Sequence, residues 1–367
     1  MRIAIVGTRG VPSRYGGFET FAEQLATRLV RRGEEVVVYC RPQFTSPQDE
    51  LDPRIRRIIL PTIPSKYLDT FVHTFLSILH VTFSKVDVVL VCNVANAPFA
   101  WIPRLAGKPT VLNVDGLDRK RRKWNAVARA YLFLCEIIAL FTPTHLVTDA
   151  EVIQRYYLKR YGKRSSMIAY GAEVLPGAER PQGLELPTGK YFLSVSRLEP
   201  ENNPELIIRA YGKIKTDWPL VVVGGNPYDG NYLNRLKSIA GHGVIFTGPV
   251  YGQGYWWLQR NAGAYIYASE VGGTHPGIVE AMAAGNCVLF LDTPENREAV
   301  ADAGLAFAAS ADELARQMQF VLSDPEKCRQ LGAQAESRVK AFYSWDEVTS
   351  EYDKLFRQVR PELAQRV

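Results

Sequence analysis

Cysteine and histidine are scarce in this chain of 367 residues, with five of each. The cysteines are dispersed and mostly lie in apolar segments: Cys40, Cys92, Cys135, Cys287 and Cys328. An odd, scattered set of this kind is typical of reduced thiols in the cytosol and excludes a disulfide framework. No cluster of His, Asp and Glu has the spacing of metal ligands, so no metal site is expected.

The sequence also lacks segments that would direct the chain elsewhere. Met1 and Arg2 lead directly into a strand pattern, without the charged region, long apolar core and cleavage site of a signal peptide. There is no internal repeat, no low-complexity tract and no recognisable nucleic-acid-binding module. We therefore expect a cytoplasmic protein that binds no nucleic acid.

Charge is unevenly distributed along the chain. Residues 1–172 contain 25 Lys and Arg against 14 Asp and Glu, whereas residues 173–367 contain 19 against 24. The first half is thus basic and the second half mildly acidic. A basic half indicates a polyanionic partner, and an anionic lipid surface is preferred because no nucleic-acid-binding module accompanies the charge.

Short runs rich in Val and Ile alternate with helical stretches in two series. Such runs are typical of strands buried on both faces of a parallel sheet, so the alternation predicts an α/β fold. The first series has strand candidates at 2–7, 35–40, 86–91, 109–114 and 145–148, with helix candidates at 17–32, 67–83 and 124–140. The second has strand candidates YFLSVS, LVVVGG, VIFTG, AYIYAS and CVLFLD, with helix candidates at 203–214, 228–240, 253–261, 277–284 and 310–323.

A segment rich in Gly and Pro separates the two series. Residues 171–190 keep neither a helical nor a strand period, so the linker is placed there. The sequence predicts two Rossmann-like domains, residues 1–172 and 173–344, with a cleft between the carboxyl ends of their sheets. Residues 345–367 begin with an amphipathic helix that is predicted to pack back on the first domain.

The first strand candidate ends in GTRGVPSRYGGFET, a glycine-rich turn that leads into a helix. Gly16 and Gly17 at the helix start would let backbone amides approach a phosphate or a sugar. The turn is not the spaced G-x-G-x-x-G fingerprint, and the second strand ends in Cys40 and Arg41, where a dinucleotide fold has an acidic residue. A tight turn without a ligand is the alternative interpretation.

A second candidate follows the first strand of the second domain, in the segment SRLEPENN. Arg197 in this segment would hold a diphosphate by charge-assisted, bidentate hydrogen bonds. The alternative is a surface ion pair with Glu199 or Glu201.

The segment EVGGTHPGIVEAMAAG supplies the third candidate. Gly273, Thr274 and His275 lead into a helix whose first amides would receive a phosphate. Glu280, one turn into that helix, would accept hydrogen bonds from both ribose hydroxyls. Alternatively, Glu280 is only an acidic residue favoured by the helix dipole.

Taken together, these segments resemble the family 4 retaining glycosyltransferases over essentially the whole chain. GTRGVPSRYGGFETF, NVDGLDRKRRKW, RLEPENN and VGGTHPGIVEAMAAG are similar to the branch that contains bacterial rhamnosyltransferases of polysaccharide assembly. The resemblance implies the GT-B architecture of two Rossmann-like domains facing across a cleft. It implies a metal-independent hexosyltransferase without a cofactor, since the nucleotide sugar is a substrate. The implied partners are a dTDP- or UDP-sugar, with dTDP-rhamnose as the first choice, and a lipid-linked glycan acceptor.

The resemblance also assigns roles to single positions. Gly16 and Gly17 match the loop near the donor diphosphate and the acceptor. Arg197 matches the Arg that binds the diphosphate, and Glu280 matches the Glu that binds the nucleotide ribose. Thr274 lies at the helix start that would help Arg197 to stabilise the departing diphosphate.

Three positions depart from the family pattern. Asn202 stands where a Lys is usual, so the diphosphate needs another cation, with Arg9 and Arg14 as candidates. Gly272 stands where the first Glu of the motif is usual, so recognition of the donor sugar must differ. Asp115 stands where a His is common. We expect Asp115 to stabilise an oxocarbenium-like sugar or to hold an acceptor hydroxyl.

A basic run lies directly before the third helix candidate of the first domain. It consists of Arg119, Lys120, Arg121, Arg122, Lys123 and Trp124. A polybasic cluster beside a Trp and an apolar helix is typical of a segment that meets anionic lipids, at about 1 kcal/mol per Lys or Arg. Arg129 and Glu136 interrupt the helix, so it is not expected to span a membrane. We expect a peripheral protein at the inner face of the cell membrane; a solvated basic turn is the alternative.

Two other classes of function stay open. An NAD(P)-dependent oxidoreductase would begin with the same fold class, although the glycine fingerprint is imperfect. A non-catalytic protein that binds a glycan or a lipid carrier would explain the substituted motif positions. Binding of NAD without nucleotide-sugar binding would favour the first, and failure to hydrolyse any nucleotide sugar would favour the second.

Overall fold

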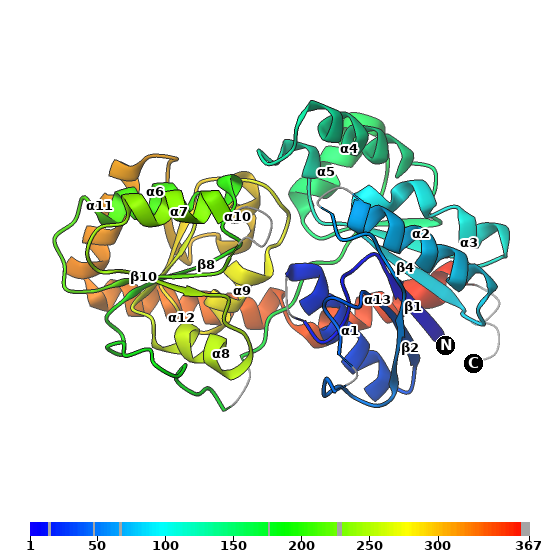
Figure 1. The fold of residues 1–367 in the computed structure, drawn as a ribbon, viewed down its shortest axis with the longest axis horizontal. Helices are drawn as coiled ribbons and strands as arrows, with labels where there is room; N and C mark the ends of the chain where they lie inside the picture. The colour runs from blue at the N-terminus through cyan, green and yellow to red at the C-terminus, as the bar shows by residue number, and fades with distance from the viewer. Residues whose placement is uncertain (14–15, 47, 66–67, 175–176, 226–229, 361–367) are drawn as a thin grey trace. The chain divides into compact units, whose positions relative to one another are not determined.

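The computed structural model describes residues 1–367 apart from 14–15, 47, 66–67, 175–176, 226–229 and 361–367 (Figure 1). The chain forms two compact units. Unit 1 comprises Met1–Lys120, Trp124–Tyr170 and Trp345–Val367; unit 2 comprises Arg121–Lys123 and Gly171–Ser344. Each unit contains one parallel sheet with helices on both faces, which confirms the predicted α/β fold class.

Unit 1 is built on a seven-stranded sheet with the order β3-β2-β1-β4-β5-β6-β7. Its strands are β1 (Arg2–Val6), β2 (Glu35–Cys40), β3 (Ile55–Ile59), β4 (Val88–Cys92), β5 (Thr110–Val114), β6 (His145–Thr148) and β7 (Ser166–Met167). Chain order reverses between β1 and β4, which are hydrogen-bonded neighbours. The loops after these two strands therefore lie at a topological switch point, where α/β folds bind ligands.

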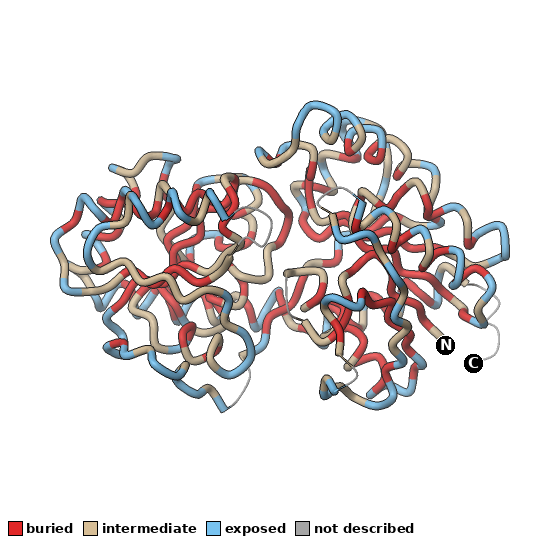
Figure 2. Tube along the Cα trace, viewed as in Figure 1, coloured by how far each residue is buried: buried red, intermediate tan, exposed pale blue. Residues whose placement is uncertain are grey.

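Two helical layers cover this sheet. The helices are α1 (Gly17–Arg31), α2 (Leu68–Phe83), η1 (Val94–Phe99), α3 (Ile102–Leu105), η2 (Asp118–Lys120), α4 (Ala126–Ile138), α5 (Glu151–Tyr161) and α13 (Trp345–Val359). Apolar side chains of α1 and α13 form one core with alternate strand residues. Those of α2, η1, α4 and α5 form a second core with the remaining strand residues. The central strands between the two layers are buried, as Figure 2 shows.

The final helix, α13, belongs to the core of unit 1. Trp345, Val348, Tyr352 and Leu355 lie on its buried stripe, each at most 5% exposed. The Tyr352 ring also packs against Phe21 of α1, with 5.2 Å between the ring centroids. The stripe read from the sequence is thus the face that this helix buries.

Unit 2 is built on a six-stranded sheet with the order β10-β9-β8-β11-β12-β13. Its strands are β8 (Phe192–Val195), β9 (Leu220–Val223), β10 (Val244–Gly248), β11 (Ala264–Tyr267), β12 (Val288–Leu291) and β13 (Gly304–Phe307). Its helices are η3 (Pro200–Asn202), α6 (Pro204–Tyr211), α7 (Gly230–Ile239), α8 (Gly252–Asn261), α9 (Pro276–Ala283), α10 (Pro294–Val300), α11 (Ala311–Ser323) and α12 (Pro325–Phe342). Chain order reverses between β8 and β11, so this sheet also has a switch point.

The sequence analysis identifies the central strands but misses several peripheral elements: β3, α3, α5, β7, α10, β13 and α12. β3 has the sequence IRRII and lies at the sheet edge, so it lacks the continuous apolar run of a central strand. β13 is also an edge strand, in the other sheet, and its four residues begin with Gly304. Edge strands need less apolar surface because one side has no neighbouring strand.

Candidate functional site

The glycine-rich turn after β1 has a backbone shape that only glycine fits. Gly7 and Gly10 have φ angles of +91° and +124°. A Cβ on Gly7 would lie 2.5 Å from the carbonyl oxygen of Cys92, and one on Gly10 would lie 2.8 Å from the Cβ of Cys40. The turn is therefore packed tightly against the neighbouring strand ends.

Gly16 and Gly17 lie at the start of α1, where the sequence analysis placed them: Gly16 is the N-cap residue and Gly17 the first helical residue. Acidic side chains from the first turns of α1 fasten the preceding loop. The amide of Arg9 donates to Glu19 Oε1 at 2.8 Å, and Glu23 accepts from another loop amide at 2.6 Å. These two loop amides are already engaged, so a phosphate would find fewer donors here than the sequence predicts.

A polar cluster follows the adjacent strands β4 and β5. Asp115 comes directly after β5 and is half-buried. Asn93, which follows β4, donates from Nδ2 to Asp118 Oδ2 at 2.9 Å. Burial raises the pKa of the Tyr170 phenol, and the nearby Asp115 carboxylate raises it further. The sequence analysis found Asp115 but missed Asn93 and Asp118, whose signal was their position just beyond buried strands.

In unit 2, Arg197 lies in the loop after β8 and α9 begins shortly after the adjacent strand β11. Both candidates thus belong to the switch point of this sheet. Arg197 Nη1 is 3.8 Å from Glu199 Oε2, so the ion pair considered as an alternative is present. The Arg197 side chain remains 32% exposed and accessible to an anion.

Lys123 lies beside Arg197, although it is distant in sequence. Its Nζ is 3.0 and 3.1 Å from the two carboxylate oxygens of Glu199. Burial and the neighbouring Arg197 guanidinium lower the pKa of Lys123 to about 8. Asn202, at the position where the family has Lys, instead donates from Nδ2 to the Arg197 carbonyl at 2.8 Å. The second cation of this site therefore comes from Lys123.

The sequence analysis named two further cations, Arg9 and Arg14, as candidates. The Arg9 guanidinium stands over the Phe44 ring at 5.3 Å, in unit 1. Arg14 lies outside the described residues.

The basic run is only partly exposed, and its contact with lipids stays a prediction. Four of its cations pair with acids: Arg119 with Glu136, Arg121 with Glu201, Arg122 with Glu270 and Lys123 with Glu199. Lys120 is exposed, whereas Trp124 is half-buried. The local sequence shows the bases but not the acids, three of which come from the loops after β8 and β11.

The pKa values of two acids beside these cations, Glu199 and Glu201, are shifted in opposite directions. Glu199 is buried, which raises its pKa, but Arg197 and Lys123 outweigh burial and lower the pKa overall. Burial and the adjacent Glu199 carboxylate raise the pKa of Glu201. Arg121 and Lys123 both lie 4.0 Å from Glu201 Oε1. The cations are therefore held in place by acids while the cluster keeps an excess of bases.

His275 explains the missing Glu at position 272. A Cβ on Gly272 would lie 2.0 Å from the imidazole of His275, so the ring occupies the space of a side chain at that position. His275 is the N-cap residue of α9, and its ring packs on Tyr267 with 5.3 Å between the centroids. Gly273 and Thr274, between them, are buried.

The start of α9 offers fewer amides than the sequence predicts. Pro276, the first helical residue, has no N–H. The amide of Ile278 donates to the His275 carbonyl at 3.2 Å. An anion bound here would consequently depend more on the nearby cations than on the helix start.

Glu280 projects from α9 toward α8. Its Oε2 accepts a hydrogen bond from the Tyr255 hydroxyl at 2.5 Å, and Gln259 Nε2 donates to that hydroxyl at 2.9 Å. Burial raises the pKa of Glu280, while the Tyr255 hydrogen bond lowers it. Tyr255 and Gln259 orient the carboxylate, and neither was found from the sequence because both read as ordinary helix residues.

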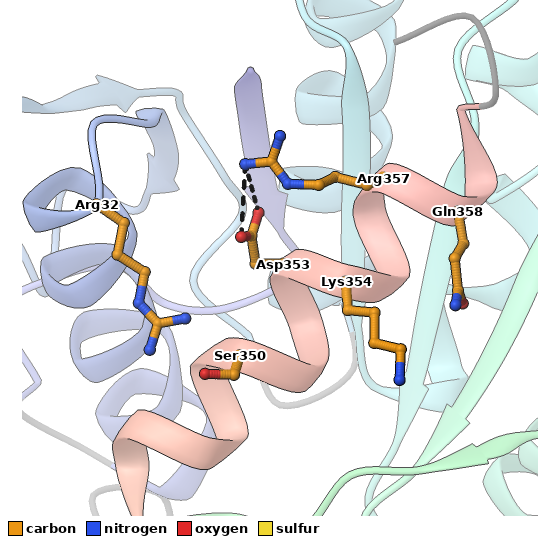
Figure 3. A pocket seen from close by; sticks show the side chains of 6 residues that line it. All are labelled: Arg32, Ser350, Asp353, Lys354, Arg357 and Gln358. Carbon is orange, nitrogen blue, oxygen red and sulfur yellow. Dashed lines mark hydrogen bonds and ion pairs between the residues drawn. The ribbon is translucent and has the colours of Figure 1, made fainter. Parts of the chain in front are cut away.

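One cavity lies away from the residues of both switch points. It is a shallow pocket of about 440 Å³ lined by Arg32, Ser350, Asp353, Lys354, Arg357 and Gln358, beside α13 in unit 1 (Figure 3). Asp353 and Arg357 pair across one turn of that helix. None of the candidate residues lines it.

In the part of the chain that the structure describes, no group of three or more His, Cys, Asp and Glu is arranged to hold a metal ion. Within the same ranges, no helix combines the length and apolarity needed to cross a bilayer.

Solved structures share this architecture across the whole chain. Sucrose-phosphate synthase from Thermosynechococcus elongatus superposes with a TM-score of 0.82 at 21% identity, over 98% of both chains. HepE from Anabaena, in complex with UDP-glucose, superposes with a TM-score of 0.76 at 14% identity, over 98% of this chain and all of the other. These likenesses show that the two units make up a GT-B fold.

Two sequence-family models show the family to which the chain belongs. The model of Glycosyltransferase Family 4 matches residues 15–171, and that of Glycosyl transferases group 1 matches residues 178–338. Together they cover most of the chain, which therefore belongs to the family 4 glycosyltransferases. Phosphatidyl-myo-inositol mannosyltransferase from Mycolicibacterium smegmatis is 28% identical over 223 residues, which span 58% of this chain and 57% of that relative.

Proposed function

We propose that the chain is a retaining glycosyltransferase that binds the diphosphate of a nucleotide sugar in unit 2. The observation that carries this proposal is the pair of cations Arg197 and Lys123 at the β8–β11 switch point, beside the start of α9. A diphosphate needs more than one positive charge, and charged hydrogen bonds from Arg and Lys supply it. Glu280 on α9 would bind the ribose of the same nucleotide.

The chemistry follows from the charge that develops on the leaving group. As the bond from the sugar to the diphosphate breaks, negative charge grows on the phosphate oxygens, and Arg197 and Lys123 stabilise it. His275 occupies the place of the usual motif Glu and would contact the donor sugar. Asp115 would act on the acceptor side, by holding a hydroxyl or by stabilising positive charge on the sugar.

The sequence resemblance and two of the similar proteins bear on the donor sugar and the acceptor. The sequence resemblance favours dTDP-rhamnose, whereas HepE was solved with UDP-glucose and the mycobacterial relative is named as a mannosyltransferase. That relative's name also indicates a lipid acceptor. We propose a lipid-linked glycan as the acceptor and the cytoplasmic face of the membrane as the place of reaction.

Turnover of a nucleotide sugar tests the activity itself. Purified chain is incubated with dTDP-rhamnose, UDP-glucose and GDP-mannose, and the released nucleoside diphosphate is measured with EDTA or with added magnesium. We expect release from at least one donor, unchanged by EDTA, because cations of the chain take the place of a metal. No release from any sugar nucleotide would favour a non-catalytic binding protein. Release abolished by EDTA and restored by magnesium would contradict metal independence.

The pKa of Lys123 gives donor binding a pH dependence. The lowered pKa, about 8, means that Lys123 is charged below pH 8 and loses its charge as the pH rises above it. Affinity for the nucleotide sugar should therefore fall by roughly tenfold or more above pH 8, the worth of a charged hydrogen bond. Lys123→Arg should abolish this dependence because guanidinium stays charged.

Calorimetry at pH 7 and pH 9 measures the effect. Lys123→Met paired with Glu199→Gln serves as the control, since it removes the ammonium without leaving the Glu199 carboxylate unpaired. This double variant should bind weakly at both pH values. If its affinity matches that of the wild type, Lys123 only holds Glu199 and does not bind the donor.

A further inference from the structure

Helix α2 has apolar side chains on both of its sides, with Ile78 and Val81 buried in the core. Asp69, His73 and Ser77 lie on its buried side, where Asp69 pairs with the buried Arg41 at 2.6 Å. Its outward side carries a stripe of large apolar side chains, each 36 to 46% exposed: Leu68, Phe71, Phe75 and Leu79. A helix on the surface of a soluble protein ordinarily turns such a stripe inward.

Helix α4 is similar, with Leu132 and Cys135 buried. Its buried side holds Glu136, whose carboxylate accepts hydrogen bonds from Tyr156 and Tyr161 at 2.5 and 2.6 Å. Val127, Phe133 and Leu134 are exposed instead. These three apolar side chains thus lie on its outer side.

The two helices form one surface because both flank η1. The rings of Phe71 and Phe75 pack on Phe99 of η1, at 4.9 and 5.7 Å between centroids. From α4, the Tyr131 hydroxyl donates to the Ala95 carbonyl of η1 at 3.0 Å. Figure 1 shows α2, α3 and α4 in one part of unit 1. We call the outer side of α2, η1, α3 and α4 the apolar face.

The opposite layer provides the contrast. In the described ranges, eighteen large apolar side chains are exposed, and twelve of them lie on or beside the helices α2 to α5. Neither α1 nor α13 exposes any within those ranges, because the two helices pack on each other. The exposure is thus confined to one side of the sheet and is too extensive for ordinary scatter on a surface.

The edge of the apolar face combines its most exposed side chains with positive charge. Phe83, Leu105 and Phe141 are 74 to 88% exposed and lie in the turns that enter the adjacent strands β4, β5 and β6. The turns entering β4 to β7 are residues 83–87, 104–109, 141–145 and 160–165. They contain six Lys and Arg against one acid, Asp87, which pairs with Arg360.

Three of these cations connect the turns to one another through backbone carbonyls. Lys108 Nζ donates to the Thr82 carbonyl at 2.7 Å, and Lys163 Nζ donates to the Leu140 carbonyl at 2.6 Å. Arg104 donates to the Thr142 carbonyl at 2.8 Å. Exposed aromatic and aliphatic tips are in this way set in a rim of positive charge.

We propose that the apolar face docks on a bilayer that contains anionic lipid. Apolar side chains would enter the boundary between headgroups and acyl chains, and the basic rim would meet the anionic headgroups, an arrangement typical of interfacial binding. Exposed apolar side chains beside a basic edge suit a bilayer with anionic headgroups better than a protein partner. The docking rests on the proposed function only in that it would bring unit 1 to a lipid-linked acceptor.

Flotation of the full chain with vesicles tests the proposal. The vesicles are phosphatidylcholine with or without phosphatidylglycerol. The test variant is Phe83→Ser, Leu105→Ser and Phe141→Ser combined, and the control combines Tyr251→Ser and Phe342→Ser, which are exposed in unit 2. We expect the wild type and the control to float with the anionic vesicles. The test variant should bind these vesicles at least about tenfold more weakly than the wild type.

Three results would overturn the proposal. The wild type does not float with anionic vesicles at low salt, the test variant floats like the wild type, or the wild type is a dimer that the test variant dissociates. The last result would mean that a second copy covers the face. Nucleotide-sugar affinity is measured on the same variants and should not change. A chain that floats but binds no nucleotide sugar would refute the proposed function and leave the docking intact.

Discussion

Replacement of Arg197 by Ala is expected to weaken binding of the nucleotide sugar by roughly 10- to 100-fold. Charged hydrogen bonds contribute about 1.5–3 kcal/mol each, and the Arg197 side chain is more exposed than that of Lys123. Turnover should fall at least as far, because the guanidinium also stabilises charge that develops on the leaving diphosphate.

Calorimetry and product release measure both effects. Arg209→Ala is the matched control, since Arg209 is an exposed cation of α6 in the same unit and pairs with Glu205. Its loss should leave donor affinity unchanged. Equal affinity of the wild type and Arg197→Ala would place the diphosphate elsewhere.

Replacement of Gly224 by Ala is expected to cost about 3 kcal/mol or more of the free energy of unfolding of unit 2. Gly224 follows β9 with a φ angle of +134°, and a Cβ there would lie 1.9 Å from the backbone oxygen of Ser196. Such a conformation is nearly restricted to glycine, and the clash is with backbone that cannot turn away. Because Ser196 precedes Arg197, donor binding should weaken as well.

Thermal unfolding of the wild type and of Gly224→Ala checks this expectation. Gly189→Ala is the control, since Gly189 also has positive φ, at +72°, but a Cβ there would meet nothing within 4 Å. That substitution should cost only about 1–2 kcal/mol, the strain of a left-handed residue. Equal destabilisation by the two substitutions would show that the contact with Ser196 yields easily.

Much of the fold follows from the sequence because the central strands are buried on both faces. Continuous apolar runs such as EVVVYC and LVVV are typical of strands buried on both faces, and they form β2 and β9. IRRII of β3 needs just one neighbouring strand and tolerates two Arg, so no periodicity marks it. The edge strand β3 is missed for that reason.

The candidate site divides along similar lines. Arg197 and Glu280 are predictable because each follows a buried strand at a switch point, where local sequence decides position. The position of Lys123 beside Arg197 is not predictable, since the acids that hold Lys123 lie in the loop after β8. The exposed apolar sides of α2 and α4 are also hidden, because a stripe of apolar residues does not show which side of the helix faces the sheet.

The most direct test of the central claim is a calorimetric titration of the full chain with UDP, dTDP, GDP and NAD at neutral pH. We expect that at least one nucleoside diphosphate binds at one site per chain, that Arg197→Ala weakens this binding, and that NAD does not bind. Binding of NAD together with no binding of any nucleoside diphosphate would contradict the account and favour an oxidoreductase.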